Sequence, residues 1–434
     1  MDKIVIIGSG MAGLGAAYRL NNEGATSVVY DKNAYVGGHT ASWKDRHGFI
    51  FDEGPHISFT KDERMIELFA ESVNHEYESV KAVMNNHWCG HWIKHPVQCN
   101  LHGLPDELVI KVIRDFVDVM NTTPDNINTY EDWLKNTYGT SFARTFPMEY
   151  GLKYHTAPAD RMTTDWLGPR LYRPSLEEVL RGALSPETDD VHYITDFRYP
   201  SNNGFASYLT LFKKRVNVIL EKQVVKVDPE TRTLEFIDGS KDNYDHLITS
   251  VPLPELVAMI RGAPDDVVAA AEKLACSKCV LVNIGLDRDD ISDAHVSYFY
   301  DRDYVFTRLS FPHMLSTGNA PAGCGSIQAE LYYSDKYRPL DKHPEELVDP
   351  TINDLKRCGL IREEDRIITS DCRLVQYANV IYDHDRADAL NKVQEFLDEK
   401  KIQCCGRYGE WGYYWTDESF KSGESAAQRI LDSL

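Results

Sequence analysis

The chain has 434 residues, of which 42% are hydrophobic and 26% charged, with a formal net charge of −20 at pH 7. This length allows two or three domains with ample cores, and the acidic balance argues against nucleic-acid binding because no basic stripe could replace phosphate counterions. No uninterrupted apolar span approaches the ~18 residues of a transmembrane helix. The N-terminus has no signal-peptide pattern, so we expect a cytoplasmic protein.

The chain opens on a pattern typical of a dinucleotide-binding unit. Residues 3–7 are a short, β-rich apolar run, and a helix is predicted after the glycine-rich turn that follows them. In that turn Gly8 permits a tight bend, Gly10 lets a diphosphate approach the backbone, and Gly13 lets helix and strand pack closely. A second apolar run ends at Asp31, where the fingerprint places the carboxylate that binds a ribose hydroxyl. A purely structural glycine turn is the alternative.

The segment after Asp31 favours FAD over NAD. Gly37 and Gly38 form a paired-glycine turn. This turn resembles the extended flavin fingerprint of the amine oxidase, protoporphyrinogen oxidase, phytoene desaturase and UDP-galactopyranose mutase group. The resemblance implies that the turn runs close to the phosphates of the cofactor. His56 lies in a polar, glycine-containing loop that is a candidate for lining the flavin, with a plain hairpin as the alternative.

The middle of the chain reads as an inserted substrate domain. Amphipathic helices are expected over residues 108–120 and 131–146, after strands between residues 84 and 101. A turn-rich stretch with short helical pieces follows over residues 163–184. We therefore expect residues 84–204 to form a mainly helical substrate domain.

Strands predominate in the rest of the chain. A hairpin over residues 216–238 and a strand over 244–251 are expected to return the chain to the first sheet. Three strands between residues 280 and 333 suit a sheet that roofs the flavin. The tail combines a strand, a glycine turn and a helix over about 422–431, which we expect to close over the isoalloxazine ring and diphosphate.

These elements predict an α/β fold, in which a Rossmann-like FAD-binding domain carries inserted mixed α+β substrate domains. The FAD-binding domain is expected to be discontinuous, over residues 1–83, 205–255 and 370–434. Residues 256–369 are expected to form the β-sheet substrate or roof domain.

Nine cysteines are scattered along the chain, which suits reduced thiols better than a disulfide framework. Cys276 and Cys279 form a CxxC motif without a second pair at zinc spacing, so we interpret them as core or strand-edge residues. Another group alternates with apolar residues as in a half-buried hairpin: His87, Cys89, His91 and His95. We predict no metal site, with metal or redox chemistry as the minor alternative.

A set of tyrosines and arginines carries a resemblance to a known family. Tyrosine hydroxyls and arginine guanidinium groups can bind a diphosphate with only a few positive charges in the site. The set comprises Arg170, Tyr298, Arg308, Tyr377, Arg407 and Tyr413. With the Gly54-Pro55-His56 loop and the segment 94–100 that contains Gln98, it resembles UDP-galactopyranose mutases, more the eukaryotic type than the bacterial, nearly end to end.

The resemblance implies a role for each of these residues. His56 would lie against the flavin and Arg407 would face it, while Gln98 falls at a uracil contact. The diphosphate of the substrate would be bound by Arg170, Tyr298, Arg308, Tyr377 and Tyr413, and the catalytic set would be His56, Arg170 and Arg308.

Several positions depart from the family pattern. Asp417 replaces an asparagine and puts a carboxylate near the expected diphosphate. In the uridine pocket His95, Gly151 and His155 stand for tyrosine, asparagine and tryptophan. The diphosphate site is thus kept while the base pocket is altered, which leaves the sugar and the base open.

The implied reaction is a pyranose–furanose isomerisation in which N5 of reduced flavin attacks the anomeric carbon of a nucleotide sugar. The runner-up is an FAD-dependent oxidoreductase of the amine oxidase, protoporphyrinogen oxidase or desaturase type, and a non-catalytic flavin-binding protein is a third reading. No second GxGxxG module is present, so NAD(P)H as external reductant would have to enter the same cleft. The sequence leaves the oligomeric state open, a homo-oligomer included.

Overall fold

The expected β-α-β unit is present in the computed structural model, which describes residues 2–122 and 126–434. Strand β1 (Ile4–Ile7), helix α1 (Met11–Asn22) and strand β2 (Ser27–Tyr30) follow each other directly. β1 lies at the centre of a parallel five-stranded sheet, and all four of its residues are buried. Its neighbours are β2 and β13 (His246–Thr249), and the outer strands are β9 (Val218–Ile219) and β19 (Ile402–Cys404). This parallel arrangement confirms the α/β prediction.

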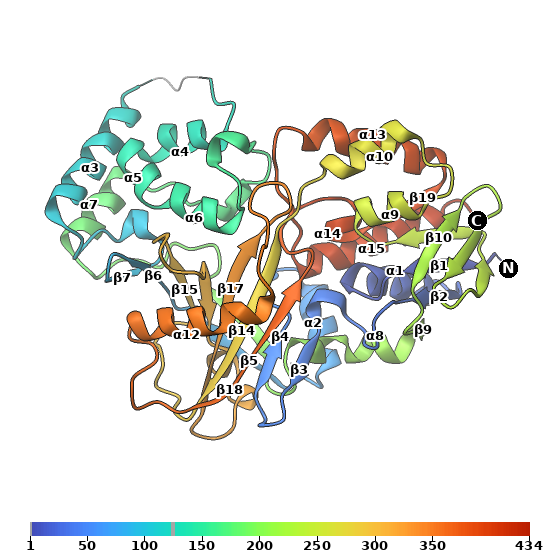
Figure 1. The fold of residues 1–434 in the computed structure, drawn as a ribbon, viewed down its shortest axis with the longest axis horizontal. Helices are drawn as coiled ribbons and strands as arrows, with labels where there is room; N and C mark the ends of the chain where they lie inside the picture. The colour runs from blue at the N-terminus through green and yellow to red at the C-terminus, as the bar shows by residue number, and fades with distance from the viewer. Residues whose placement is uncertain (1, 123–125) are drawn as a thin grey trace.

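Helices cover this sheet and join the two ends of the chain. Helix α15 (Thr416–Leu431) packs on α1, where Ala16 and Ala426 are fully buried in one cluster, so the two helices approach closely. Figure 1 shows the N- and C-termini at the same edge of the molecule. The neighbouring helices are α2 (Glu63–Ser72), α8 (Thr210–Arg215), α9 (Leu253–Met259), α10 (Asp265–Lys273), α13 (Arg386–Glu399) and α14 (Gly406–Gly409).

A larger, mostly antiparallel sheet stands beside the parallel one (Figure 1). Its strands, in spatial order, are β18 (Ile367–Val375), β14 (Lys278–Leu286), β17 (Gly325–Tyr333), β16 (Arg308–Ser310), β15 (Val296–Phe299), β6 (Met84–Trp88) and β7 (His91–Lys94). Helix α12 (Val348–Arg357) packs on one face, where Leu355 is buried with Val280 and Ile327. Short helix α11 (Pro312–Leu315) follows β16.

The seven-stranded sheet extends across two expected domain boundaries. The hairpin β6–β7 begins at residue 84, and β6 pairs in parallel with β15. Strand β18 begins before residue 370 and pairs with β14. These partners lie far from each other in sequence, so local patterns could not connect them. We still propose three domains. In this proposal the β6–β7 hairpin and strand β18 belong to the roof sheet.

The helical group contains α3 (Asp106–Met120), α4 (Tyr130–Tyr138), α5 (Thr140–Thr145), α6 (Pro147–Tyr154) and α7 (Leu176–Leu184). The sequence predicted one helix over residues 131–146, whereas the structure has a break at Gly139, with φ +81°. A Cβ there would lie 2.7 Å from the backbone carbon of Asp115, so only glycine fits this crossing between α3 and α5. In Figure 1 the group lies above β6 and β7.

Smaller sheets complete the structure: β3 (Ser42–Lys44) with β4 (Ile50–Asp52), β5 (Tyr77–Lys81) with β8 (Asp196–Pro200), and β10 (Val224–Asp228), β11 (Thr233–Phe236) and β12 (Lys241–Asn243) together. All nine cysteines carry free thiols. Within the described residues, no helix is long and apolar enough to cross a membrane, and no cluster of three or more His, Cys, Asp or Glu side chains could hold a metal ion.

Lys153 on α6 gives a testable link between burial and stability. Its side chain is buried, and Nζ donates to the carbonyl oxygens of Phe299 (3.1 Å) and Asp301 (2.7 Å). Burial lowers the pKa of Lys153 to about 7. Above that pH the folded protein has released a proton that the unfolded chain still holds, up to a pKa of about 10.4. Because of Lys153, the free energy of unfolding therefore increases as the pH rises above 7.

We expect Lys153→Met to flatten this rise. In the wild-type protein the lysine contributes up to about 1.4 kcal/mol per pH unit above neutrality, whereas methionine of similar volume has no proton to release. Urea unfolding at several pH values between about 6 and 9 measures the difference. Equal pH slopes for the two proteins would show that Lys153 keeps its ordinary pKa.

Candidate active site

One cavity of about 1460 Å³ collects residues from all parts of the chain. It is lined by the turn after β1, by strands of the roof sheet and by helices α4 to α6. The predicted site residues that line it are Gly8, Gly10, Asp31, Gly37, Gly38, His56, Gln98, Arg170, Tyr298, Arg308, Tyr377, Arg407 and Tyr413. Gly13 and Asp417 are not among the lining residues.

The glycine-rich turn has the geometry of a diphosphate cradle. Gly8 has φ +99°, and a Cβ on Gly13 would lie 1.9 Å from the carbonyl oxygen of Gly8. A Cβ on Gly10 would instead find its nearest atom, the carbonyl oxygen of Gly37, at 3.8 Å, so Gly10 opens onto free space. The N-cap of α1 at Gly10 has no side-chain hydrogen bond, which leaves its N–H groups for an anion. These residues fit the diphosphate of FAD.

Asp31 also holds the turn in place. One carboxylate oxygen accepts from the backbone N–H and the hydroxyl of Ser9, both at 2.6 Å. The other accepts from the N–H of Asn33 at 2.8 Å. Asp31 therefore orients the glycine-rich turn through Ser9. It also lies at the position where the fingerprint places the carboxylate that binds a ribose hydroxyl.

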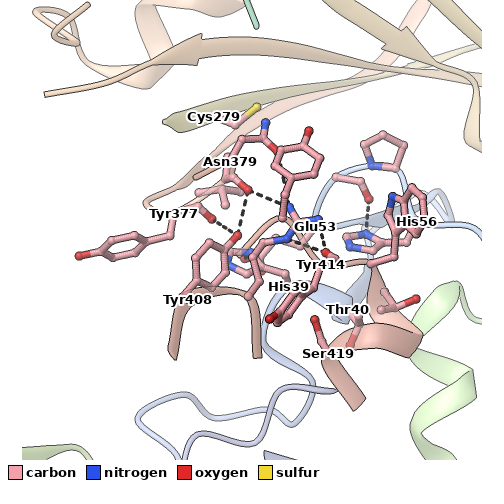
Figure 2. A pocket seen from close by; sticks show the side chains of 18 of the residues that line it. His39, Thr40, Glu53, His56, Cys279, Tyr377, Asn379, Tyr408, Tyr414 and Ser419 are labelled. Atoms are coloured by element: carbon pink, nitrogen blue, oxygen red, sulfur yellow. Dashed lines mark hydrogen bonds and ion pairs between the residues drawn. The ribbon is translucent and has the colours of Figure 1, made fainter. Parts of the chain in front are cut away.

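Figure 2 shows a part of the cavity where two histidines and a carboxylate lie together. Nδ1 of His56 contacts the carbonyl oxygen of Gly54 at 2.8 Å, and burial lowers the pKa of His56 to about 4, so this ring is neutral. His39 Nδ1 lies 3.1 Å from Glu53 Oε1. Burial alone would raise the pKa of Glu53, but the hydrogen bond and charge of His39 lower it. We did not predict this pair, although His39 directly follows the paired glycines.

Arg308 is held by a carboxylate that the sequence analysis missed. Its Nε and Nη2 donate to the two oxygens of Glu330, each at 2.7 Å, and the two residues face each other on β16 and β17. Tyr332 donates a further hydrogen bond to Glu330, whose side chain is 1% exposed. Nη1 of Arg308 is therefore the group left to face a ligand. A bidentate pair of this kind is planar and strongly directional.

Arg170 and Arg407 are bound through backbone carbonyls. Arg170 donates to the carbonyl oxygens of Trp166 (3.0 Å) and Tyr413 (2.7 Å), and its Nε is buried without a partner. Arg407 donates to the carbonyl oxygens of Tyr414 (2.8 Å) and Ala378 (3.1 Å). Among the described residues, neither guanidinium has a carboxylate within ion-pair distance. Their charges are therefore available to an anion in the cavity.

Buried tyrosines form much of the remaining wall. The hydroxyl of Tyr413 lies 2.8 Å from that of Tyr154, and burial raises the pKa of both. Tyr298 stacks on His95 with ring centroids 4.8 Å apart, while Tyr377 packs near Tyr408. These hydroxyls stay protonated and can donate to an anion. Tyr150 and Tyr154 were missed because nothing local distinguishes them among 24 tyrosines.

Of two residues that were expected to contact the ligand, Gln98 lines the cavity and Asp417 does not. Asp417 accepts from the Thr60 hydroxyl at 2.7 Å and lies 3.7 Å from Lys421, so its carboxylate is engaged outside the cavity lining. Gln98 lines the cavity, and its Nε2 donates to the carbonyl oxygen of Tyr172 at 3.1 Å, which leaves Oε1 as an acceptor.

The parallel sheet, the diphosphate cradle and the large cavity define a flavoprotein of the Rossmann type. The chain belongs to the flavin containing amine oxidoreductase family, whose model matches residues 11–431. It is therefore an FAD-dependent enzyme of that superfamily, and the expectation of FAD is confirmed at this level.

Solved structures support the same fold over the whole chain. The structure of a reduced UDP-galactopyranose mutase superposes with a TM-score of 0.94 at 25% identity, covering 100% of this chain and 96% of that one. The predicted likeness to that group is thereby confirmed. The structure of a putative protoporphyrinogen oxidase from Exiguobacterium sp. 255-15 has a TM-score of 0.76 at 16% identity, covering 100% and 99% of the two chains, and shows the fold alone.

Curated relatives match only a short segment. The 15-cis-phytoene desaturase of Synechococcus elongatus is 39% identical over 69 residues, which is 16% of this chain and 15% of the relative. The 4,4'-diapophytoene desaturase of Staphylococcus aureus (strain bovine RF122 / ET3-1) is 42% identical over 60 residues, 14% and 12% of the two chains. The match thus covers less than a sixth of the length of these relatives, and we infer no substrate from them.

Proposed function

We propose that the protein is an FAD-dependent nucleotide-sugar mutase that interconverts the pyranose and furanose forms of a sugar attached to a nucleoside diphosphate. The observation that carries the proposal is that Arg170 and Arg308, which are distant in sequence, line one cavity with the Gly10 turn. One diphosphate cradle is needed for FAD. The additional arginines, with Tyr298 and Tyr413, provide a place for a second diphosphate.

In this proposal the protein binds, orients and stabilises charge, and reduced flavin supplies the nucleophile for the anomeric carbon. Arg170 and Nη1 of Arg308 bind the diphosphate as it leaves the sugar. Such electrostatic help is usually worth several kcal/mol. Tyr298, Tyr377 and Tyr413 donate neutral hydrogen bonds, and His56, uncharged in its buried loop, faces the flavin with Arg407. The aromatic walls keep water from the reacting carbon.

A panel of nucleotide sugars tests the proposal. The FAD-loaded protein is reduced with dithionite under anaerobic conditions and offered nucleotide sugars that differ in sugar and base. We expect chromatography to reveal a pyranose–furanose pair for at least one compound, and the oxidised protein to be inactive. If no compound is isomerised, while an amine or polyene is oxidised with uptake of oxygen, the chain is an oxidoreductase instead.

The electron donor is a separate part of the proposal. Flavin must be reduced before the first turnover, and NAD(P)H is the candidate external reductant. NAD(P)H would enter this same cavity, whose volume of about 1460 Å³ exceeds the upper end of ordinary ligand pockets, about 1,000 Å³. Bleaching of the flavin absorbance by NADPH or NADH under anaerobic conditions measures this step.

A further inference from the structure

Near its end the chain leaves the wall of the cavity and then returns to it through a strained turn. Tyr408 and Tyr413 both line the cavity, whereas residues 409–412 between them do not. Within this segment Trp411 has φ +51°, although its large side chain is fully buried. A tryptophan rarely adopts this left-handed conformation, because its Cβ then lies too close to the following carbonyl oxygen. The turn at Trp411 therefore has to be held by its surroundings.

Arg386 holds this turn from outside the cavity. It is the first residue of α13 and is not among the residues that line the cavity. Its Nε donates to the carbonyl oxygen of Trp411 at 3.1 Å, and its Nη2 donates to the same oxygen. Its guanidinium lies over the ring of Tyr382, 3.8 Å from the centroid, and the Tyr382 hydroxyl accepts from the N–H of Tyr413 at 3.1 Å. Arg386 thus binds Trp411 directly and packs on the residue that binds Tyr413.

The position of Arg386 is unfavourable for an arginine in itself. The nearby carboxylates of Asp383 and Asp385 are paired with Lys336, and among the described residues Arg386 has no carboxylate within ion-pair distance. Burial lowers its pKa below the usual value, although the charges of Asp165 and Asp383 act to raise it. As the first residue of α13 it also puts a positive charge at the positive end of the helix dipole. Costs of this kind are typical of residues that serve a functional site.

The turn that Arg386 holds fixes an arginine of the cavity wall. The carbonyl oxygen of Tyr413 accepts from Nη2 of Arg170 at 2.7 Å. The guanidinium of Arg170 also lies 4.5 Å from the centroid of the Tyr413 ring. A change in the backbone at Trp411, two residues before Tyr413, would therefore move both contacts of Arg170.

We propose that Arg386 is a positioning residue for the second diphosphate. It holds Trp411 in the left-handed conformation, so that Tyr413 keeps Arg170 at the place where the anion binds. Arg386 itself does not touch the ligand. This inference rests on the proposed function and adds to it a residue that acts only through others. A small misplacement of a binding group by a distant substitution can cost as much as about 100-fold.

The test is a double-mutant cycle between Arg386 and Arg170. The affinity for UDP is measured by isothermal titration calorimetry on the FAD-loaded full-length protein. Arg386→Met removes the donors to Trp411, and Arg170→Met removes the cation in the cavity. We expect each single variant to bind UDP at least about tenfold more weakly than the wild type. The double variant should bind within about threefold of Arg170→Met, because Arg386 acts through Arg170.

Arg357→Met is the matched control. Arg357 also lies over a tyrosine ring, 3.8 Å from the centroid of Tyr304, and donates to a backbone carbonyl, that of Asp303, at 2.9 Å. It belongs to α12 and does not line the cavity, so its loss should leave the affinity for UDP unchanged. Arg386→Lys keeps the charge and a donor and should bind UDP more tightly than Arg386→Met. This variant replaces Arg386→Met in the cycle if the methionine variant does not fold with FAD.

Two results would overturn the role of Arg386 and leave the mutase proposal standing. One is an affinity of Arg386→Met for UDP within about twofold of the wild type. The other is a double variant in which the two losses multiply, because Arg386 would then act independently of Arg170. If the wild-type protein does not bind UDP, or if Arg170→Met binds it as tightly as the wild type, the proposed function itself is contradicted, and this inference with it.

Discussion

Gly10→Val yields a folded protein without bound FAD. Apart from its two chain neighbours, a Cβ at Gly10 would meet no protein atom closer than the carbonyl oxygen of Gly37 at 3.8 Å, so the turn has room for a side chain there, and valine would fill the space into which the diphosphate would fit. We expect the affinity for FAD to fall by at least about 100-fold, or about 2.7 kcal/mol. The ratio of flavin to protein absorbance after purification and an added-FAD titration measure the loss.

Gly13→Val is the control that separates cofactor binding from folding. Its Cβ would lie 1.9 Å from the carbonyl oxygen of Gly8, so it distorts the turn and should lower the thermal midpoint even in the absence of FAD. Gly10→Val should leave that midpoint nearly unchanged when both proteins are compared without cofactor. Retention of stoichiometric FAD by Gly10→Val would contradict the assignment of the cradle.

Removal of the Arg308–Glu330 pair should abolish binding of nucleoside diphosphates and leave FAD in place. Arg308→Ala alone would bury an unpaired Glu330 carboxylate, and breaking a buried pair costs about 3–5 kcal/mol of stability. The double variant Arg308→Met with Glu330→Gln removes both charges with little change in volume. We expect UDP to bind this protein at least about 100-fold more weakly than the wild type, measured by calorimetry on the FAD-loaded forms.

Glu330→Gln alone keeps Arg308 and provides the matched comparison. It should retain FAD and bind UDP at least as tightly as the wild type, because the guanidinium loses its competing carboxylate. An unchanged UDP affinity in the double variant would show that Arg308 has no contact with the diphosphate.

Much of the cofactor domain could be predicted because its signals are local. The strand, the glycine turn, the helix and Asp31 all lie within the first 31 residues, and each obeys a rule of backbone geometry or hydrogen bonding. The place of β6 and β18 in the roof sheet could not be predicted, because their partners are strands far away in the sequence. The break at Gly139 follows from a contact with α3 that no local pattern reveals.

The candidate site was predictable only through resemblance. That comparison selected Arg308 and Tyr413, which do line the cavity, whereas composition could not have distinguished them. It did not reveal Glu330, which faces Arg308 across two strands, or the pair of His39 and Glu53. It also implied that Asp417 lies near the diphosphate; in the structure its carboxylate accepts from the Thr60 hydroxyl, and its place relative to a ligand stays a prediction. Partners brought together by the fold depend on register and loop path, which single-sequence patterns do not encode.

The number of sugars isomerised per reduced flavin distinguishes a mutase from an oxidoreductase. The flavin is photoreduced once under anaerobic conditions, the excess donor is removed, and a nucleotide sugar identified in the panel is added. For a mutase we expect many product molecules per flavin, with the flavin spectrum still that of the reduced form at the end. No more than one product per flavin, with the flavin oxidised in step, would contradict the mutase proposal and identify an oxidoreductase.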